Sequence, residues 1–518
     1  MVKDISPWEQ LKLDVNPYVG PEIFTRLAQG TVEDLTEKDD MVLRWHGLYR
    51  HRPVENGRFM LRLKMPGGTL NAAQAATVAS LAERFSGGKL CLTTRQNVQL
   101  HNLELAALPA VFAELYAVGL QSLGACGDQV RNVVACPVTG IDPTSLLDTT
   151  PVSEALTAAF FGNPAFVNLP RKFKISVCGC KQHCVPSEIN DLSFVAALDD
   201  DGRPGFVLWV GGGLSAQPVM AKDLGVWMGV EDVVDVASAA VEIFRDEGNR
   251  VKRTKSRIKY LINERGVPWF LEEIERRLGR KLQRRTTPVS APLHGDHLGV
   301  NLQSDPELVY IGIPVPVGIM TSVQLQAIAE IAAVTSPGRV RLTHQQNLII
   351  GDIPRTQLDG VLAKLSAVEL PVDPEPNLAR IVSCTGLDYC NKALVYTKAR
   401  ARQLGEDLDT RLSSLPISIR MSGCPNGCGQ HAIADIGLQG VLVKNEAGEQ
   451  EQRFDIWIGG GESDRPAFAR RSIPKVRPEQ LVNVISDLWS RYKAEAIDDS
   501  ETFSAYARRV LWEVRPAV

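Results

Sequence analysis

The chain of 518 residues repeats itself, and this internal duplication restricts its fold more than any other feature of the sequence. Four short segments recur in the same order about 250 residues later. The pairs are Leu92–Val98 with Leu342–Leu348, Arg131–Val134 with Arg380–Ser383, Leu169–Lys174 with Leu415–Arg420, and Trp209–Gly213 with Trp457–Gly461. Two units are too few for a solenoid. They predict instead two similar halves packed about a pseudo-twofold axis, with a site between them.

Each half opens with the same predicted order of elements. Residues 59–64 alternate apolar and polar side chains, as a half-buried strand does, and end at the turn signal Pro66-Gly67-Gly68. A helix is predicted from Asn71 to Phe85, with Asn71 as its N-cap, and a strand follows over 91–100. The second half repeats this unit, with its helix from Ser322 to Ala333.

These patterns predict a mixed α/β chain of the α+β class. A chain of this length can bury several hydrophobic cores without disulfides to hold it together. The expected parts are an N-terminal extension (1–41), a small unit (42–115), a larger mixed unit (116–285), a second small unit (302–368), a second larger unit (369–492) and a C-terminal tail (493–518).

Composition and charge argue against nucleic-acid and membrane partners. The net charge of -3 and pI of about 6.3 speak against nucleic-acid binding, which usually requires a basic surface. The N-terminus has no basic segment followed by an apolar run, and no apolar stretch is long enough to predict a membrane span. We therefore expect a cytoplasmic protein with neither nucleic-acid nor membrane partners. In that reducing compartment, ten cysteines indicate metal or redox chemistry rather than disulfides.

Two pairs of cysteines in the second half have the spacing of metal ligands. Five residues separate Cys384 from Cys390, and three separate Cys424 from Cys428. Four thiolates are what a [4Fe–4S] cluster requires, and the neighbouring glycines let the backbone wrap closely around it. Zinc is an alternative, although its paired ligands are usually two to four residues apart. Four buried structural cysteines are the other alternative.

The two cysteine motifs resemble the signature of ferredoxin-dependent nitrite and sulfite reductases, and the resemblance covers nearly the whole chain. It implies that the two small units are ferredoxin-like half domains and that the larger units bind sirohaem and the iron–sulfur cluster. It also implies that Cys384, Cys390, Cys424 and Cys428 hold the [4Fe–4S] cluster and that Cys428 is axial to the sirohaem iron. Reduced ferredoxin is the electron donor that the resemblance implies.

The same resemblance assigns residues to substrate and cofactor. Arg62, Arg131, Lys172 and Lys174 match the residues that bind the oxyanion substrate. Residues two apart on a strand point to the same face, so Lys172 and Lys174 are expected on one side and Phe173 on the other. The acidic rim of sirohaem requires further cations and polar groups. The candidates are Arg95, Arg171, Arg253, Gln96, Asn97, Gln346 and Asn347.

The substrate predicted from these residues is sulfite, reduced with six electrons to sulfide. Lys174 favours sulfite, because the family's nitrite reductases tend to carry Asn at its position. The segments around Arg62 and Arg95 resemble the nitrite branch more closely, so nitrite reduction to ammonia is the alternative. A non-catalytic iron–sulfur electron carrier is the alternative from another class, and four clustered cations argue against it. We expect a monomer, and no Tyr–Cys crosslink at Tyr49, since Gln129 stands where the partner cysteine is expected.

A further group of cysteines in the first half lies outside the family pattern. Cys180 and Cys184 precede Cys424 and Cys428 by 244 residues, with the same three-residue gap. Together with Cys136 and Cys178 they predict a second [4Fe–4S] cluster; free thiols and a redox-labile pair are the alternatives. The remaining cysteines, Cys91 and Cys126, are expected in the hydrophobic core.

Overall fold

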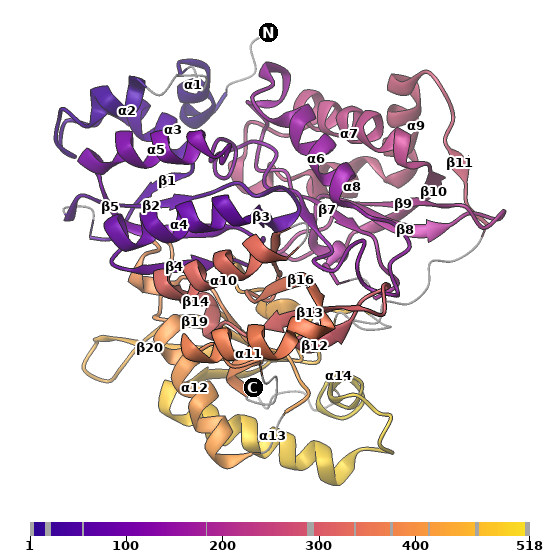
Figure 1. Cartoon of the computed structure of the whole chain (residues 1–518). Coiled ribbons are helices and arrows are strands. Elements are labelled where there is room, and N and C mark those ends of the chain that lie inside the picture. The colour runs from indigo at the N-terminus through magenta and orange to yellow at the C-terminus, as the bar shows by residue number, and fades with distance from the viewer. Residues whose placement is uncertain are drawn as a thin grey trace.

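The structure is a computed structural model that describes residues 5–15, 22–53, 56–182, 184–286, 295–335, 338–372, 377–412, 415–461 and 466–512 (Figure 1). These residues form four β-sheets flanked by helices, which confirms the predicted α+β class. No helix in these ranges is both long and apolar enough to cross a lipid bilayer.

The two small units exchange a strand with each other. The first sheet has the order β1 (Leu48–Arg50), β2 (Arg58–Arg62), β5 (Val98–Glu104), β4 (Lys89–Leu92) and β14 (Ile319–Thr321). The second has the order β12 (Gly299–Leu302), β13 (Leu308–Ile313), β16 (Leu348–Pro354), β15 (Arg339–Leu342) and β3 (Thr69–Asn71). Met320 of the second half thus pairs with Leu90, and Leu70 of the first half pairs with Val340. Each sheet is completed by the other half.

The helix that follows each exchanged strand begins in the same way. Helix α4 (Ala72–Phe85) has the predicted N-cap, Asn71, which forms a capping box with Gln74. Helix α10 (Ser322–Val334) is capped identically by Thr321 and Gln324. The two helices pack against each other, and one hydrophobic core runs through both small units. The other helices of these units are α2 (Glu22–Leu27), α3 (Glu37–Trp45), α5 (Leu108–Ala117) and α11 (Leu358–Ala367).

The predicted strand over 91–100 is wrong, because the structure divides it into β4 and β5. The loop between them, 93–97, and its counterpart, 343–347, give Gln96 and Gln346 positive φ angles of 53° and 67°. Gln96 Nε2 donates to the Leu342 carbonyl oxygen at 2.9 Å, and Gln346 Nε2 donates to the Leu92 carbonyl oxygen at 2.9 Å. This pair of reciprocal hydrogen bonds ties the two halves together.

The two larger units share one sheet topology. The first sheet has the order β11 (Gln283–Arg284), β10 (Lys222–Met228), β9 (Pro204–Val210), β8 (Leu192–Leu198), β7 (Ile175–Cys178) and β6 (Val134–Ala135). The second has the order β17 (Ile381–Ser383), β18 (Ile419–Ser422), β19 (Ile436–Lys444), β20 (Gln450–Ile458) and β21 (Arg470–Val476). In each, the first three strands from the β6 or β17 edge are parallel and the next two pairings are antiparallel.

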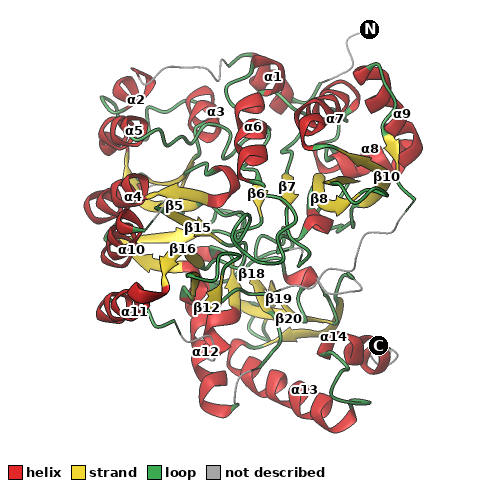
Figure 2. Cartoon of the chain, turned by 45° about the vertical axis from the view of Figure 1, so that its right-hand side comes forward, coloured by secondary structure: helices red, strands yellow, loops and turns green. Residues whose placement is uncertain are grey.

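Helices cover these sheets, and their loops meet between the four sheets at the centre of the molecule (Figure 2). The helices are α6 (Thr150–Phe160), α7 (Val233–Glu247), α8 (Ile258–Arg265), α9 (Val267–Leu278), α12 (Lys398–Arg411), α13 (Leu481–Glu495) and α14 (Phe503–Tyr506). Both described ends of the chain are packed. Lys12 in α1 (Pro7–Leu13) donates to the Leu169 carbonyl oxygen at 2.7 Å, and Phe503 joins the core of the second larger unit.

Candidate active site

The four predicted cluster cysteines come from two adjacent loops of the second larger unit. Cys384 directly follows β17 and Cys390 lies in the same loop, whereas Cys424 and Cys428 follow β18. Cys428 interacts electrostatically with each of the other three thiols, so the four are neighbours. Cys424 is buried and Cys428 is exposed.

The backbone around these cysteines suits an iron–sulfur cluster. The Gly423 N–H donates to Cys384 Sγ at 3.1 Å, and the Lys392 N–H donates to Cys390 Sγ at 3.5 Å. Such N–H donors stabilise thiolate ligands and tune the potential of the metal that they bind. Burial raises the pKa of Cys384 to about 12, so this thiol favours its protonated form until a metal replaces the proton.

The predicted substrate cations reach the same place from the first half. Arg62 is the last residue of β2, Arg131 precedes β6, and Lys172 and Lys174 precede β7. Arg62 interacts electrostatically with Cys390 and Cys428, and Lys172 interacts with Cys428. Cys428 is therefore close both to the other three cysteines and to the cations.

The two lysines lie among the other cations of this pocket, and both lose part of their affinity for a proton there. Burial, followed by the charges of Arg257 and Arg131, lowers the pKa of Lys172 to about 7. Burial, followed by the charges of Arg95 and Lys172, holds the pKa of Lys174 well below its usual value. Among the described residues, neither ammonium group has an ion-pair or hydrogen-bond partner. Gathering unpaired cations away from water is unfavourable unless an anion binds there.

The alternation predicted for this segment is confirmed by its packing. Phe173 is fully buried in the core of the first larger unit. The flanking residues, Lys172 and Lys174, remain partly accessible. A polycarboxylate cofactor and a small oxyanion held by these residues would supply the negative charge that the side chains lack. The residues present thus fit both sirohaem and a [4Fe–4S] cluster.

The three arginines predicted to bind the acidic rim of sirohaem have hydrogen-bond or ion-pair partners within the protein. Arg95 donates to Asn190 Oδ1 at 2.8 Å, and Arg171 and Arg253 both bind the carboxylate of Asp128, at 3.2 and 2.7 Å. Although burial opposes it, the charges of Lys12 and Arg253 hold the pKa of Asp128 well below its usual range. Arg171 and Arg253 would therefore have to share their charge between Asp128 and a cofactor.

The four predicted polar residues are bonded to backbone or buried in the loops that join the halves. Besides their bonds across the halves, Gln96 Oε1 accepts from the Ala135 N–H at 2.8 Å and Gln346 Oε1 accepts from the Ser383 N–H at 2.9 Å. Asn347 Oδ1 accepts from the Val315 N–H at 2.9 Å, and Asn97 is buried. These side chains position the site walls, and a direct role in binding the cofactor stays a prediction.

Two further residues in the pocket, Cys126 and Lys64, were not recognised from the sequence as parts of it, whereas Tyr49 was. Arg62 Nη1 donates to Cys126 Sγ at 3.2 Å, and Tyr49 interacts electrostatically with both residues. Lys64 is buried, and burial together with the charge of Arg131 lowers its pKa to about 8. Cys126 was expected in the core as a lone cysteine, and no spacing motif signals its place here. The predicted absence of a Tyr–Cys crosslink, based on Gln129, stays a prediction.

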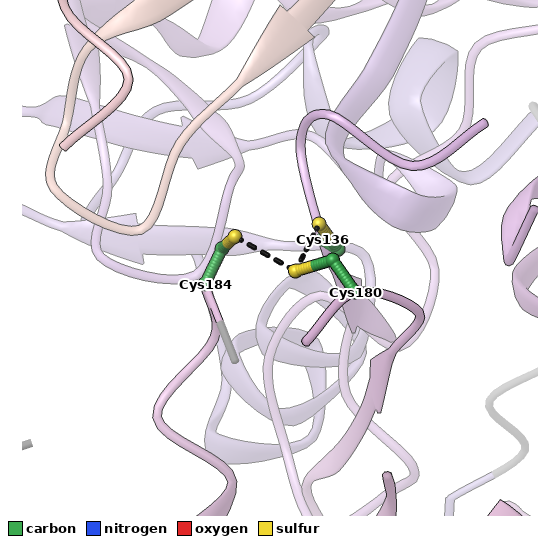
Figure 3. Close-up of side chains that lie close together, drawn as sticks. All are labelled: Cys136, Cys180 and Cys184. Atoms are coloured by element: carbon green, nitrogen blue, oxygen red, sulfur yellow. Dashed lines mark hydrogen bonds between the residues drawn. The ribbon is translucent and has the colours of Figure 1, made fainter. Parts of the chain in front are cut away.

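Three cysteines of the first half also come together (Figure 3). The Sγ atoms of Cys136, Cys180 and Cys184 all lie within 4.8 Å of one another, and all three residues are buried. Cys178, the fourth predicted ligand, directs its Sγ towards the Cys180 carbonyl oxygen at 3.7 Å. The structure thus gathers three of the four cysteines that the sequence grouped here.

Known families match both kinds of unit. A nitrite and sulphite reductase 4Fe-4S domain matches residues 126–282 and 375–508, and a nitrite/sulfite reductase ferredoxin-like half domain matches residues 52–118 and 301–368.

Relatives match over nearly the whole chain. The ferredoxin–nitrite reductase of Synechococcus elongatus is 38% identical, covering 95% of this chain and 98% of its own. The sulfite reductase [ferredoxin] 1 of Mycolicibacterium paratuberculosis is 32% identical, covering 98% and 95%. The structure of the Mycobacterium tuberculosis NirA protein superimposes with a TM-score of 0.91 at 31% identity, covering 98% and 97%. The chain therefore belongs to the ferredoxin-dependent nitrite and sulfite reductases, a family of oxidoreductases that carry sirohaem and a [4Fe–4S] cluster.

Proposed function

We propose that this protein reduces sulfite to sulfide with six electrons from reduced ferredoxin. The observation that carries the proposal is the pair Lys172 and Lys174, two partly accessible lysines just before β7 that have no ion-pair partner among the described residues, with Lys172 close to Cys428. Sulfite carries more negative charge than nitrite, and a second lysine in place of a neutral side chain favours the more highly charged anion.

Each residue set has its own part in this chemistry. Cys384, Cys390, Cys424 and Cys428 would hold the cluster, with Cys428 also facing the sirohaem iron. Sirohaem coupled to the cluster supplies electrons to the bound oxyanion. Arg62 and Arg131 bind and orient the oxygens of the substrate, as preorganised donors do at sites of developing negative charge.

The lysines also supply protons. Each oxygen that leaves the substrate departs as water and takes up two protons. Lys172, whose pKa burial and neighbouring charges lower to about 7, can hold a proton at neutral pH and release it readily. Lys174 and the buried Lys64 lie in the same group of cations and can replace the proton that Lys172 loses.

Nitrite reduction to ammonia is the second candidate. It is favoured by the relatives, since the ferredoxin–nitrite reductase of Synechococcus elongatus is 38% identical and the sulfite reductase of Mycolicibacterium paratuberculosis is 32% identical. Identity over the whole chain reports ancestry, whereas the charge of the pocket acts directly on the substrate.

The proposed donor, ferredoxin, is a small acidic protein and would bind near Cys390. Lys392 is exposed next to this cysteine, and Arg400 is exposed at the start of α12. We further propose that the protein works as a monomer in the cytoplasm.

Steady-state turnover of the holoenzyme with sulfite and with nitrite tests the proposal. We expect a higher kcat/KM for sulfite. The variant Lys174→Asn should lose about 10²–10³ in kcat/KM for sulfite and clearly less for nitrite. The matched control is Lys89→Asn, an exposed lysine on β4, which should change neither. A preference for nitrite in the unmodified enzyme, or equal losses on both substrates, would disprove the proposed substrate.

A further inference from the structure

A compact group of thiols in the first half lies apart from the candidate active site. Cys136 follows β6, and Cys180 and Cys184 lie in the loop after β7. The Sγ of Cys180 stands between the other two, 3.3 Å from Cys136 Sγ and 3.0 Å from Cys184 Sγ (Figure 3). Among the described residues, this is the group of His, Cys, Asp and Glu side chains that is close enough to bind one metal ion.

We propose that this group binds a single zinc ion through Cys136, Cys180, Cys184 and His297. With zinc–sulfur bonds of about 2.3 Å, sulfur ligands at the corners of a tetrahedron are roughly 3.8 Å apart. Two of the three sulfur–sulfur distances are 3.3 and 3.0 Å and the third is within 4.8 Å, so small side-chain movements would give that separation. In a [4Fe–4S] cluster each thiolate binds a different iron, so the thiolates must stand much farther apart.

His297 contacts Cys184 and is the candidate for the fourth ligand, although its ring nitrogens are not within 4.8 Å of all three sulfurs. Its Nε2 lies 2.8 Å from Cys184 Sγ, and its Nδ1 lies 3.1 Å from the hydroxyl of Tyr310. The Tyr310 hydroxyl in turn donates to Asp142 Oδ2 at 3.0 Å. This chain of hydrogen bonds keeps the proton on Nδ1 and leaves the lone pair of Nε2 free for a metal, as hydrogen-bonded partners of ligating histidines do. Zinc would draw Nε2 from Cys184 towards the other two sulfurs.

The comparison with the cluster loops explains why a second four-iron cluster is not favoured. Cys390 is six residues after Cys384, and Asp142 is six residues after Cys136. The cysteine that would complete a cluster is therefore replaced by the carboxylate that holds Tyr310. Cys178 lies beside the Cys180 thiol but is not a member of the group whose sulfurs are all within 4.8 Å of one another.

The proposed zinc site has a small net charge, and a nearby arginine offsets it. On binding, three thiols release three protons to solvent, and the neutral imidazole releases none. Three thiolates and one Zn²⁺ leave a single negative charge in a buried place. Arg341, which is buried against the carbonyl oxygens of Pro137 and Thr139, interacts electrostatically with Cys136 and offsets this charge.

Metal analysis of the purified holoenzyme, after incubation with Zn²⁺ and removal of the excess, is the first test. We expect about one zinc per chain, together with about five irons: four in one cluster and one in the haem. About nine irons without zinc would show a second cluster and overturn the proposal. Five irons without zinc would also overturn it.

Two variants locate the ion. Cys180→Ser should abolish zinc binding, whereas Cys91→Ser, which changes a lone buried cysteine on β4, should retain it. Tyr310→Phe provides a test that does not depend on whether the cysteine variants fold. It removes only the hydroxyl that orients His297 and should weaken zinc binding by about 10–100-fold in competition with a chelator. Unchanged affinity in Tyr310→Phe would exclude His297 as a ligand and contradict the proposed site.

Discussion

The two halves place equivalent cysteines in opposite surroundings. After β18, in the second half, Cys428 is exposed and faces the cations Arg62 and Lys172. After β7, in the first half, Cys184 is buried and faces His297. The sheets that carry the two loops have the same strand order, so the difference arises from side chains and not from topology.

Single residues account for the contrast. Arg62 pairs with Gln99 on β5, and the residue at the matching position of the second sheet is Gly312, which pairs with Ile349 on β16. A Cβ on Gly312 would lie 1.8 Å from the His297 carbonyl oxygen, so the backbone of His297 fills the space that a side chain would need.

Lys174 of the candidate pocket also has no counterpart in the second copy. The Lys174 N–H donates to Asp191 Oδ2 at 2.8 Å, and the Ser418 N–H donates to Asp435 Oδ2 at 2.8 Å. These equivalent contacts place Ser418 at the position of Lys174, and not Arg420 as the sequence pairing predicted, so the lysine is present in one half only. The duplicated fold thus keeps one open, positively charged cysteine site and one closed, nearly neutral site.

Replacing Cys428 and Cys184 by serine should have different effects, because the two cysteines belong to different sites. Cys428→Ser removes the thiolate that is close both to the other cluster cysteines and to the cations, so we expect loss of both chromophores and of nearly all turnover. Cys184→Ser should leave the visible absorption and sulfite turnover nearly unchanged, while lowering the thermal unfolding midpoint. Absorption spectra and turnover of the two holoproteins check this. If Cys184→Ser also lost its chromophores, the two sites would not be separate in function.

The hydrogen bonds of Gln96 and Gln346 are a feature that the two halves share, and substitutions of these glutamines test whether they are equally important. Gln96→Leu and Gln346→Leu each leave buried backbone groups without hydrogen-bond partners. Each should lower the free energy of unfolding by about 1–3 kcal/mol, and by similar amounts. Thermal unfolding measures the effect, with the exposed Gln326→Leu on α10 as the control. A large effect from only one of them would show that the hydrogen bonds are equivalent in geometry but not in energy.

The lowered pKa of Lys172 predicts that the KM for sulfite depends on pH. A lysine binds anions while protonated, which holds below its pKa, and burial and neighbouring charges lower that pKa to about 7. The KM for sulfite should therefore rise by up to about tenfold per pH unit above 7. Lys172→Arg keeps its charge and should give a flatter profile. Parallel profiles would assign the pH dependence to the substrate or to another group.

The smallest expected effect concerns the donor. Lys392→Glu reverses an exposed charge beside Cys390 and should raise the KM for reduced ferredoxin a few-fold at low ionic strength, and less at high salt. Lys222→Glu, on β10 of the first half, is the matched control. Equal effects of the two reversals would indicate that ferredoxin responds to net charge and not to a surface near the cluster.

The sequence predicted the duplication, the helix capped by Asn71, and the cysteine and cation motifs, because these depend on short-range patterns. It did not predict the exchange of β3 and β14, since strand partners are set by contacts between distant segments. Nor did it identify His297 or Tyr310, which belong to no motif and meet Cys184 only in three dimensions. The Asp128 carboxylate that binds Arg171 was unexpected for the same reason.

The exchanged strands have a consequence for how this chain can be made and divided. Because β14 completes the first sheet and β3 completes the second, neither half on its own could satisfy the hydrogen bonds of β4 or β15. A truncated half would expose an unpaired sheet edge, which is prone to pair with other chains and aggregate. During synthesis, the first half must keep the β4 edge available until β14 leaves the ribosome, and Met320 of β14 follows its partner Leu90 by 230 residues. The duplicated gene product is therefore a single unit of folding, even though its parts look like two proteins.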